Sequence, residues 1–323
     1  MIYIESRIGG RSENQDFYGT TQTHYGELIV VCDGMGGHNG GRLAAETAVQ
    51  IIIDEVSKSN DINSANALHI AITKANAAIW KQSHANINLK GMGTTVVALL
   101  LTPEKAICCH VGDSRIYQLR KGKILHRTYD HSHVFELVKA GLITEEQARL
   151  SEKSNIITRG LGIRATVDIE ITDNLSYKKG DHFLLCTDGI CGAVPENQLV
   201  KQVSQKGNVQ LILKNLVDQI DEVGKTNGGN HDNLTAAMIE LETDSSFQQV
   251  EQGQVIASQP KSRVKQLVYL LLIILSCLLA FNLYFNSHRK KQNKIIEKNI
   301  KIKQTSNVNS KTVDTTSITP IKK

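Results

Sequence analysis

Five aspartates stand where the sequence predicts that a β-strand begins, turns or ends, and glycine lies beside or near four of them. These residues are Asp16, Asp33, Asp113, Asp188 and Asp232. If the strands form packed sheets, the five side chains collect at one edge of the sheets. Two carboxylates about 4 Å apart repel by roughly 4 kcal/mol at an effective dielectric constant near 20, so such a cluster requires cations. Ligation by oxygen alone, without a cluster of Cys or His, favours Mg²⁺ or Mn²⁺ over zinc.

Arg11 adds a second chemical capacity to this set. Two divalent ions about 3.5–4 Å apart can share a hydroxide that is nucleophilic at neutral pH. The planar guanidinium of an arginine suits a phosphate oxyanion. Paired metals and an arginine therefore predict hydrolysis of a phosphate ester without a covalent enzyme intermediate. For any single aspartate an ordinary turn is an equally good interpretation, and it is the recurrence of the pattern that favours a metal site.

The stretch around Asp33 shows the pattern most clearly. An apolar run at 28–32 predicts a buried strand that ends at the aspartate. Gly34, Gly36 and Gly37 then let the chain turn sharply and bring main-chain carbonyls close to whatever the carboxylate holds. This stretch therefore offers both a carboxylate and a carbonyl oxygen to a hard cation.

Hydrophobic periodicity predicts the elements that position these residues. Apolar residues three and four apart predict helices from Gly40 onward and over about 64–84, 195–205 and 209–223. Apolar runs predict strands at 2–8, twice within 16–32, and at 94–101, 105–111, 115–119, 124–126, 166–174, 182–187 and 234–241. The mixed stretch 130–165, with short helical pieces at 134–140 and 144–150, is longer than an ordinary loop. Inserts of this kind often cover a functional site.

Seven motifs occur in the order seen in the metal-dependent protein phosphatase (PPM, type 2C) family. They are Arg11-x-x-Asn-Gln-Asp16, Val-Cys-Asp33-Gly-Met-Gly-Gly-His38, Gly91-Met-Gly-Thr-Thr95, Val-Gly-Asp113-Ser-Arg, Asp130-His-Ser, Cys-Thr-Asp188-Gly and His-Asp232-Asn-Leu-Thr. Residues 1–242 resemble this family, and their compact length is similar to that of its bacterial branch. The resemblance implies an α+β fold, a four-layer αββα sandwich of two antiparallel sheets between helix pairs, with a dinuclear Mn²⁺/Mg²⁺ site at one end.

The resemblance also implies how the two ions are held. Asp33 would bridge both ions, and the carbonyl of Gly34 would bind one of them. Asp188 and Asp232 would hold the second ion. Asp16 would support the site directly or through water.

Other positions bear on substrate binding, a third ion and proton donation. By the same resemblance Arg11 would bind the substrate phosphate, and Asp113 matches an aspartate that helps to bind a third, weaker ion in bacterial relatives. Those relatives often carry another aspartate four residues after Asp188, where this chain has Gly192, which predicts weaker binding of the third ion or none. The histidine proposed as general acid in eukaryotic relatives has no clear counterpart. His38 lies nearby, but a histidine on a glycine loop is more often exposed or hydrogen-bonded.

The charge distribution argues against nucleic acid as a partner. Residues 261–323 contain thirteen Lys or Arg and two acids, Glu297 and Asp314, a net charge of +11. Subtracted from the chain's total of +5, this leaves −6 for residues 1–260. A nucleic-acid-binding domain carries its positive charge on the folded part. The six cysteines lie mostly inside apolar runs without a C-x-x-C pair, which predicts core residues in a reducing compartment.

A stretch of 22 uncharged and mostly apolar residues, 266–287, predicts a single transmembrane helix, because about 20 such residues span a bilayer. The chain then divides into a catalytic domain at 1–242, a linker at 243–265, the span at 266–287 and a disordered basic tail at 288–323. The positive-inside rule would keep the basic tail in the cytoplasm. The N-terminus has no signal-peptide layout, which favours instead a cytoplasmic catalytic domain. We predict a single-pass cell-membrane protein with the catalytic domain in the cytoplasm.

These observations predict a membrane-tethered protein serine/threonine phosphatase that uses two Mn²⁺ or Mg²⁺ ions. Its expected partners are phosphorylated proteins, including a serine/threonine kinase and the substrates of that kinase. The alternative is a non-catalytic metal-binding sensor or interaction module with the same fold. Degenerate relatives of that kind would normally lose Asp33, Asp188 or Asp232, and this chain keeps all three. Turnover of a phosphopeptide in the presence of metal separates the two hypotheses.

Overall fold

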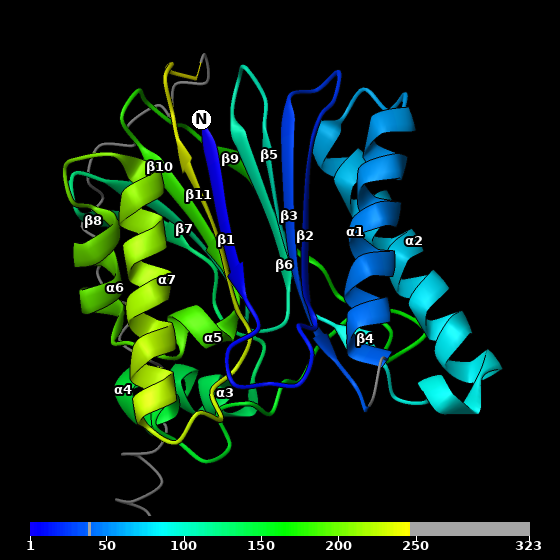
Figure 1. Cartoon of the computed structure of the whole chain (residues 1–323). Helices are drawn as coiled ribbons and strands as arrows, with labels where there is room; N and C mark the ends of the chain where they lie inside the picture. Colours follow the sequence, from blue (N-terminus) through cyan, green and yellow to red (C-terminus); the bar gives the residue numbers. More distant parts are fainter. Residues whose placement is uncertain (38–39, 246–323) are drawn as a thin grey trace, which may run out of the picture. The chain divides into compact units, whose positions relative to one another are not determined.

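Two antiparallel β-sheets pack face to face, and a pair of helices covers the outer face of each (Figure 1). The computed structural model describes residues 1–37 and 40–245. One sheet has the strand order β1-β11-β10-β7-β8, and the other has the order β2-β3-β5-β6-β9, with the short β4 paired to β3. This confirms the predicted arrangement of two antiparallel sheets with flanking helices.

The elements follow the predicted order along the chain. The strands are β1 Ile2–Arg7, β2 Asp16–Gln22, β3 Glu27–Met35, β4 Gly93–Thr94, β5 Val96–Leu101, β6 Ala106–Val111, β7 Arg115–Arg120, β8 Lys123–Arg127, β9 Glu170–Leu175, β10 His182–Cys186 and β11 Leu234–Glu240. The helices are α1 Gly40–Lys58, α2 Ser64–Ala85, η1 Ile87–Leu89, α3 His133–Lys139, α4 Glu145–Arg149, α5 Asp188–Cys191, α6 Glu196–Val203 and α7 Val209–Thr226.

Strand β3 is apolar over most of its length because both faces of its sheet are buried. Leu28 and Val30 belong to the core formed with α1 and α2, whereas Ile29 and Val31 belong to the core between the two sheets. This division follows from the alternation of side chains along a strand. Burial of an aliphatic side chain of this size contributes about 1.5–3 kcal/mol. The strand that carries Asp33 is therefore anchored from both sides.

The two helix pairs cover the sandwich with different side chains. Small residues such as Ala44 and Ala75 line the buried side of α1 and α2, which lets the helices approach the sheet closely. Helix α2 begins after Asn63, whose side chain accepts hydrogen bonds from the first backbone N–H groups of the helix. On the other sheet, Leu213 and Val217 of α7 pack into a separate core with α6.

Three elements differ from the prediction. Asp33 lies inside β3 and not at its end, because β4 pairs with the last two residues of that strand. Strand β9 begins only at Glu170, since Val167 and Ile169 pack against the α1–α2 core before pairing with β6 starts. Asp188 opens the short helix α5, where the sequence predicts a turn.

Several predictions fall on residues that the structure does not describe. The linker beyond residue 245, the transmembrane segment 266–287, the tail 288–323 and His38 all lie outside the described residues. Within 1–37 and 40–245, no helix is both long and apolar enough to cross a membrane. The five cysteines of the described part are buried and free, in agreement with the prediction: Cys32, Cys108, Cys109, Cys186 and Cys191.

Candidate active site

Five separate segments of the chain bring the aspartates together at one end of the paired strands β2 and β3. Asp16 opens β2 and lies opposite Asp33 in the β2–β3 register. Asp113 lies in the turn between β6 and β7, Asp188 opens α5, and Asp232 precedes β11. A cavity of about 760 Å³ at this end has the following predicted site residues in its wall: Arg11, Asp33, Gly34, Asp113, Asp188 and Asp232. Asp16 is buried.

The carboxyl groups oppose one another's ionisation. Burial raises the pKa of Asp33 well above its usual value, and the charges of Asp188 and Asp16 raise it further. Burial also raises the pKa of Asp16 to about 7, although hydroxyl groups nearby lower it. The pKa values of Asp113 and Asp188 are raised as well, chiefly by burial. The protein alone therefore supplies too little positive charge for this set of acids.

Two buried carboxylate oxygens have no hydrogen-bond partner within the described part of the chain: Oδ1 of Asp16 and Oδ1 of Asp188. A buried polar atom without a partner is costly unless a cation approaches it. The candidate metal-ligand atoms are all oxygens, which Mg²⁺ and Mn²⁺ prefer. Divalent cations would satisfy these oxygens and reverse the upward shift of the pKa values. The residues present therefore fit the predicted ions.

The main chain at Asp33 is fixed from two sides. Its N–H donates to Oγ1 of Thr95 at 3.0 Å, and its carbonyl accepts from the N–H of Thr95 and from Oγ1 of Thr94, both at 2.8 Å. At Gly34 a Cβ would lie 2.1 Å from the carbonyl oxygen of Gly41 in α1. Only glycine at position 34 allows β3 and α1 to approach this closely.

Asn233 holds the site together, although the sequence analysis did not single it out. Its Oδ1 accepts from the N–H of Gln15 at 2.8 Å, and its Nδ2 donates to the carbonyls of Ile8 at 2.7 Å and Glu13 at 3.0 Å. These three bonds tie the loop that carries Arg11 to the start of β11. The sequence does indicate Asn233, because this residue follows Asp232 directly within one of the seven motifs.

Thr187 is a second supporting residue that the sequence analysis did not identify. Its hydroxyl donates to Oδ2 of Asp16 at 3.0 Å and accepts from the N–H of Thr235 at 3.2 Å. Because Thr187 directly precedes Asp188, one residue connects the positions of two carboxyl groups. In the sequence it belongs to the motif Cys-Thr-Asp188-Gly and to the end of a predicted strand, and only its hydrogen bond to Asp16 at the start of β2 reveals its role.

Arg11 lies in the wall of the first cavity. Its Nη2 donates to Oδ2 of Asp232 at 2.9 Å. The two side chains are 46% and 36% exposed, and ion pairs with this exposure contribute about 0–1 kcal/mol. The guanidinium can therefore exchange Asp232 for an incoming phosphate oxygen at little cost.

A second cavity of about 710 Å³ shares Asp113, Asp188 and Arg11 with the first one. The 130–165 insert lines one part of it through Phe135 and other residues of α3 and α4, and α5 to α7 line another part. Gly192 is also in its wall. The insert reaches the first cavity too, through residues 155 and 157, so it borders the site as the sequence predicts.

Comparison with known proteins identifies the family. Residues 5–232 match the model of the family described as protein phosphatase 2C. The chain belongs to the protein phosphatase 2C family. The matched range includes Arg11 and all five aspartates. Serine/threonine phosphatase Stp of Listeria monocytogenes is 31% identical over 237 residues, which cover 71% of this chain and 91% of that protein. Protein phosphatase PhpP of Streptococcus pneumoniae is 29% identical over 244 residues, which cover 73% of this chain and 95% of that protein.

Solved structures of phosphatases share the fold. The serine/threonine phosphatase of S. agalactiae matches with a TM-score of 0.66 at 31% identity, covering 75% of this chain and 99% of that one. The catalytic domain of serine/threonine protein phosphatase PstP, solved in complex with two manganese ions, matches with a TM-score of 0.63 at 26% identity, covering 75% of this chain and 98% of that one. The predicted family, its two-sheet fold and its metal dependence agree with these relatives.

Proposed function

We propose that this protein phosphatase 2C-type chain hydrolyses phosphoserine and phosphothreonine in proteins, with Mn²⁺ or Mg²⁺ as cofactor. One observation carries the proposal. Four aspartates, Asp33, Asp113, Asp188 and Asp232, line one cavity together with Arg11. A fifth, Asp16, is buried beside Asp33, and two buried carboxylate oxygens of this set have no partner among the described residues. Such an arrangement is costly for stability and is explained by cations that take part in catalysis.

Each residue of the site has a role that suits its position. Asp33, whose main chain is held in β3, would be a ligand of both ions, and the carbonyl of Gly34 would bind one of them. Asp188 and Asp232 would hold the second ion, and Asp16, buried beside Asp33, would support the site. When bound, two such ions lower the pKa of water and so supply a hydroxide nucleophile at neutral pH.

Arg11 binds and orients the phosphate of the substrate. Its guanidinium can donate two parallel hydrogen bonds to phosphate oxygens, and its ion pair with Asp232 places it at the rim of the cavity. Asp113 would help to bind a third ion, and the lack of a carboxylate at Gly192 would make that binding weak or abolish it.

Turnover by the full-length chain tests the proposal. With Mn²⁺ present, the wild type is expected to dephosphorylate phosphothreonine peptides and p-nitrophenyl phosphate, whereas Asp33→Asn loses measurable turnover. Asp54→Asn is the matched control, because Asp54 is an exposed residue of α1 and should leave turnover unchanged. Full activity of Asp33→Asn, or an inactive wild type that still binds Mn²⁺, would refute the enzyme and favour a binding module.

The cellular setting extends this proposal. We infer a single-pass anchor at 266–287, with the phosphatase domain in the cytoplasm, from the 22 uncharged residues of that segment. Phosphoproteins at the membrane, including a serine/threonine kinase and its substrates, are then the partners within reach.

A further inference from the structure

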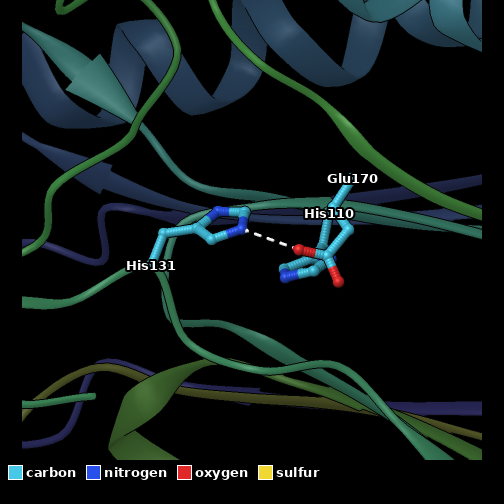
Figure 2. Close-up of side chains that lie close together, drawn as sticks. All are labelled: His110, His131 and Glu170. Carbon is cyan, nitrogen blue, oxygen red and sulfur yellow. Dashed lines mark hydrogen bonds and ion pairs between the residues drawn. The ribbon is translucent and has the colours of Figure 1, made fainter. Parts of the chain in front are cut away.

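Apart from the aspartate site, His110, His131 and Glu170 lie close together (Figure 2). His110 comes from β6, Glu170 opens β9, and His131 follows β8 at the start of the insert. Their potential metal-ligand atoms lie within 4.8 Å of one another. Both histidines are buried, and neither has a role in the proposed reaction.

The orientation of the two rings speaks against a metal ion. The imidazoles of His110 and His131 stack with centroids 4.5 Å apart and planes only 16° apart. An imidazole nitrogen binds a metal in the plane of its ring, and two stacked rings do not share such a point. Both nitrogens of His131 are also engaged, since Nδ1 accepts from the N–H of Gly112 at 3.2 Å and Nε2 lies 3.2 Å from Oε2 of Glu170.

These contacts define the protonation of His131. Burial, together with the neighbouring His110, lowers the pKa of His131 to about 4, so the ring is neutral at pH 7. A neutral imidazole has one N–H and one acceptor nitrogen. Because Nδ1 accepts from Gly112, the proton is on Nε2, which donates to Glu170 (Figure 2). Nη1 of Arg159 also lies 3.4 Å from Nε2, but a protonated Nε2 does not accept a hydrogen bond from it. Glu170 thereby keeps the acceptor of His131 turned toward Gly112.

His131 holds the turn before Asp113 at two points. Besides accepting from the N–H of Gly112, it donates its own backbone N–H to the Gly112 carbonyl at 2.9 Å. Gly112 has φ +109° and packs directly on Thr95, where a Cβ would lie 2.6 Å from the Thr95 side chain. The turn is therefore packed tightly at Gly112, and the two hydrogen bonds with His131 hold its main chain in place.

Ser114 connects this turn to the rest of the site, and His131 connects it to the later part of the insert. Ser114 Oγ lies 2.8 Å from Oγ1 of Thr95, the atom that accepts from the N–H of Asp33. On the other side, the carbonyl of His131 accepts from the N–H of Thr158, near the end of the insert, at 2.7 Å. His131, at the start of the insert, thus contacts both the Gly112–Asp113 turn and Thr158 in the later part of the insert.

The geometry points to His131 as a positioning residue, oriented by Glu170, that fixes the Gly112–Asp113 turn and so sets the affinity of the ion that Asp113 helps to bind. The inference rests on the proposed role of Asp113, and it assigns no contact between His131 and the substrate.

Amide hydrogen exchange in the full-length chain without added metal tests whether His131 fixes the Gly112–Asp113 turn. His131→Phe keeps a ring stacked on His110 and removes both nitrogens, whereas the Oδ1 of His131→Asn can replace Nδ1 as acceptor. We expect exchange of the Gly112 amide to become about fivefold faster in His131→Phe, the effect of one lost hydrogen bond, and to stay near the wild-type rate in His131→Asn.

Calorimetric titration with Mn²⁺ tests whether His131 sets the affinity of the ion that Asp113 helps to bind. His131→Phe should weaken, by about fivefold, the same Mn²⁺ site that Asp113→Asn weakens, and His131→Asn should keep its affinity. In the Asp113→Asn background, His131→Phe should have no further effect, because the two changes act on one interaction.

Three results would overturn the inference: wild-type exchange and Mn²⁺ affinity in His131→Phe, a His131→Asn variant that has lost both, or Mn²⁺ binding that Asp113→Asn leaves unchanged. If the phenylalanine variant does not fold, His131→Asn still decides the matter, since it must retain both wild-type values. Neither measurement depends on phosphate hydrolysis, so a failure of the proposed enzymatic function remains distinguishable.

Discussion

Asp16 lies opposite Asp33 in the β2–β3 ladder, and its burial makes the stability of the protein depend on pH. The pKa of Asp16 is about 7 in the folded chain because burial disfavours its charge, compared with about 3.9 in an unfolded chain. Between about pH 4 and pH 7 the folded state therefore holds more protons than the unfolded state. The contribution of Asp16 to the free energy of unfolding falls as the pH rises through this window.

The variant Asp16→Asn isolates this effect, because asparagine can still accept the hydrogen bond from Thr187. In EDTA we expect the variant to gain stability over the wild type as the pH rises from 5 to 8, measured by urea unfolding. With saturating Mn²⁺ the order should reverse at pH 8, since the cation stabilises the carboxylate. A stability difference that does not change with pH in EDTA would contradict the assigned pKa shift.

The aspartates and Arg11 could be predicted because their residue types recur in one local setting, a strand end beside glycine. The supporting residues could not be predicted in this way. Thr187 acts on Asp16 and Asn233 acts on the 8–15 loop through contacts between segments that lie far apart in the sequence. His131 was part of a recognised motif, but its two bonds to Gly112 depend on how β6 and the insert meet.

At the scale of elements, close approach of main chains shapes the metal site. A Cβ on Gly34 would lie 2.1 Å from the carbonyl oxygen of Gly41, and a Cβ on Gly189 would lie 2.0 Å from that of Asn233. Backbone atoms cannot move aside as flexible side chains do. These two contacts hold β3 against α1 and α5 against the start of β11.

Gly34→Ala is expected to lower the free energy of unfolding by about 1–3 kcal/mol and to weaken Mn²⁺ binding, because β3 must move away from α1. Gly37→Ala is the matched control, since no atom of the described residues lies within 4 Å of a Cβ at that position, and its effect should stay within about 0.5 kcal/mol. Urea unfolding and calorimetric titration with Mn²⁺ measure the two effects. Equal behaviour of both variants would show that the contact with Gly41 is unimportant.

Element boundaries were predictable where the hydrophobic pattern is periodic, as in α1, α2 and α7. They were less predictable around the site. Asp188 begins a helix of only four residues, Asp188–Cys191, which is too short to show a helical period. Strand β3 continues through Asp33 and Gly34 because it pairs with β4, and a two-residue strand leaves no pattern in the sequence.

At the scale of the whole molecule, the charge is divided between two regions of the sequence, −6 in residues 1–260 and +11 in residues 261–323. A domain with negative charge does not bind an anionic membrane surface by electrostatic attraction. Attachment to the membrane would then depend on the 266–287 segment.

Fractionation of cells that express the full chain or residues 1–260 tests this dependence. The full chain is expected in the membrane fraction after an alkaline wash, and the 1–260 chain in the supernatant. A full chain with Arg289, Lys290 and Lys291 replaced by glutamine is the control for electrostatic adsorption, and it should stay in the membrane fraction. Sedimentation of the 1–260 chain with membranes would show that the segment is not the anchor.

The pairing of β1 with β11 joins Ile2 to Ile239, so β1 is translated long before the strand with which it pairs. Until β11 emerges, β1 lacks its partner in the sheet and the Arg11 loop lacks Asn233, which fastens it. Asp232 arrives only just before β11. A nascent chain therefore cannot assemble its metal site until almost the entire domain has been translated. A chain that terminates before β11 lacks the strand that joins β1 to β10, and we expect it to be inactive.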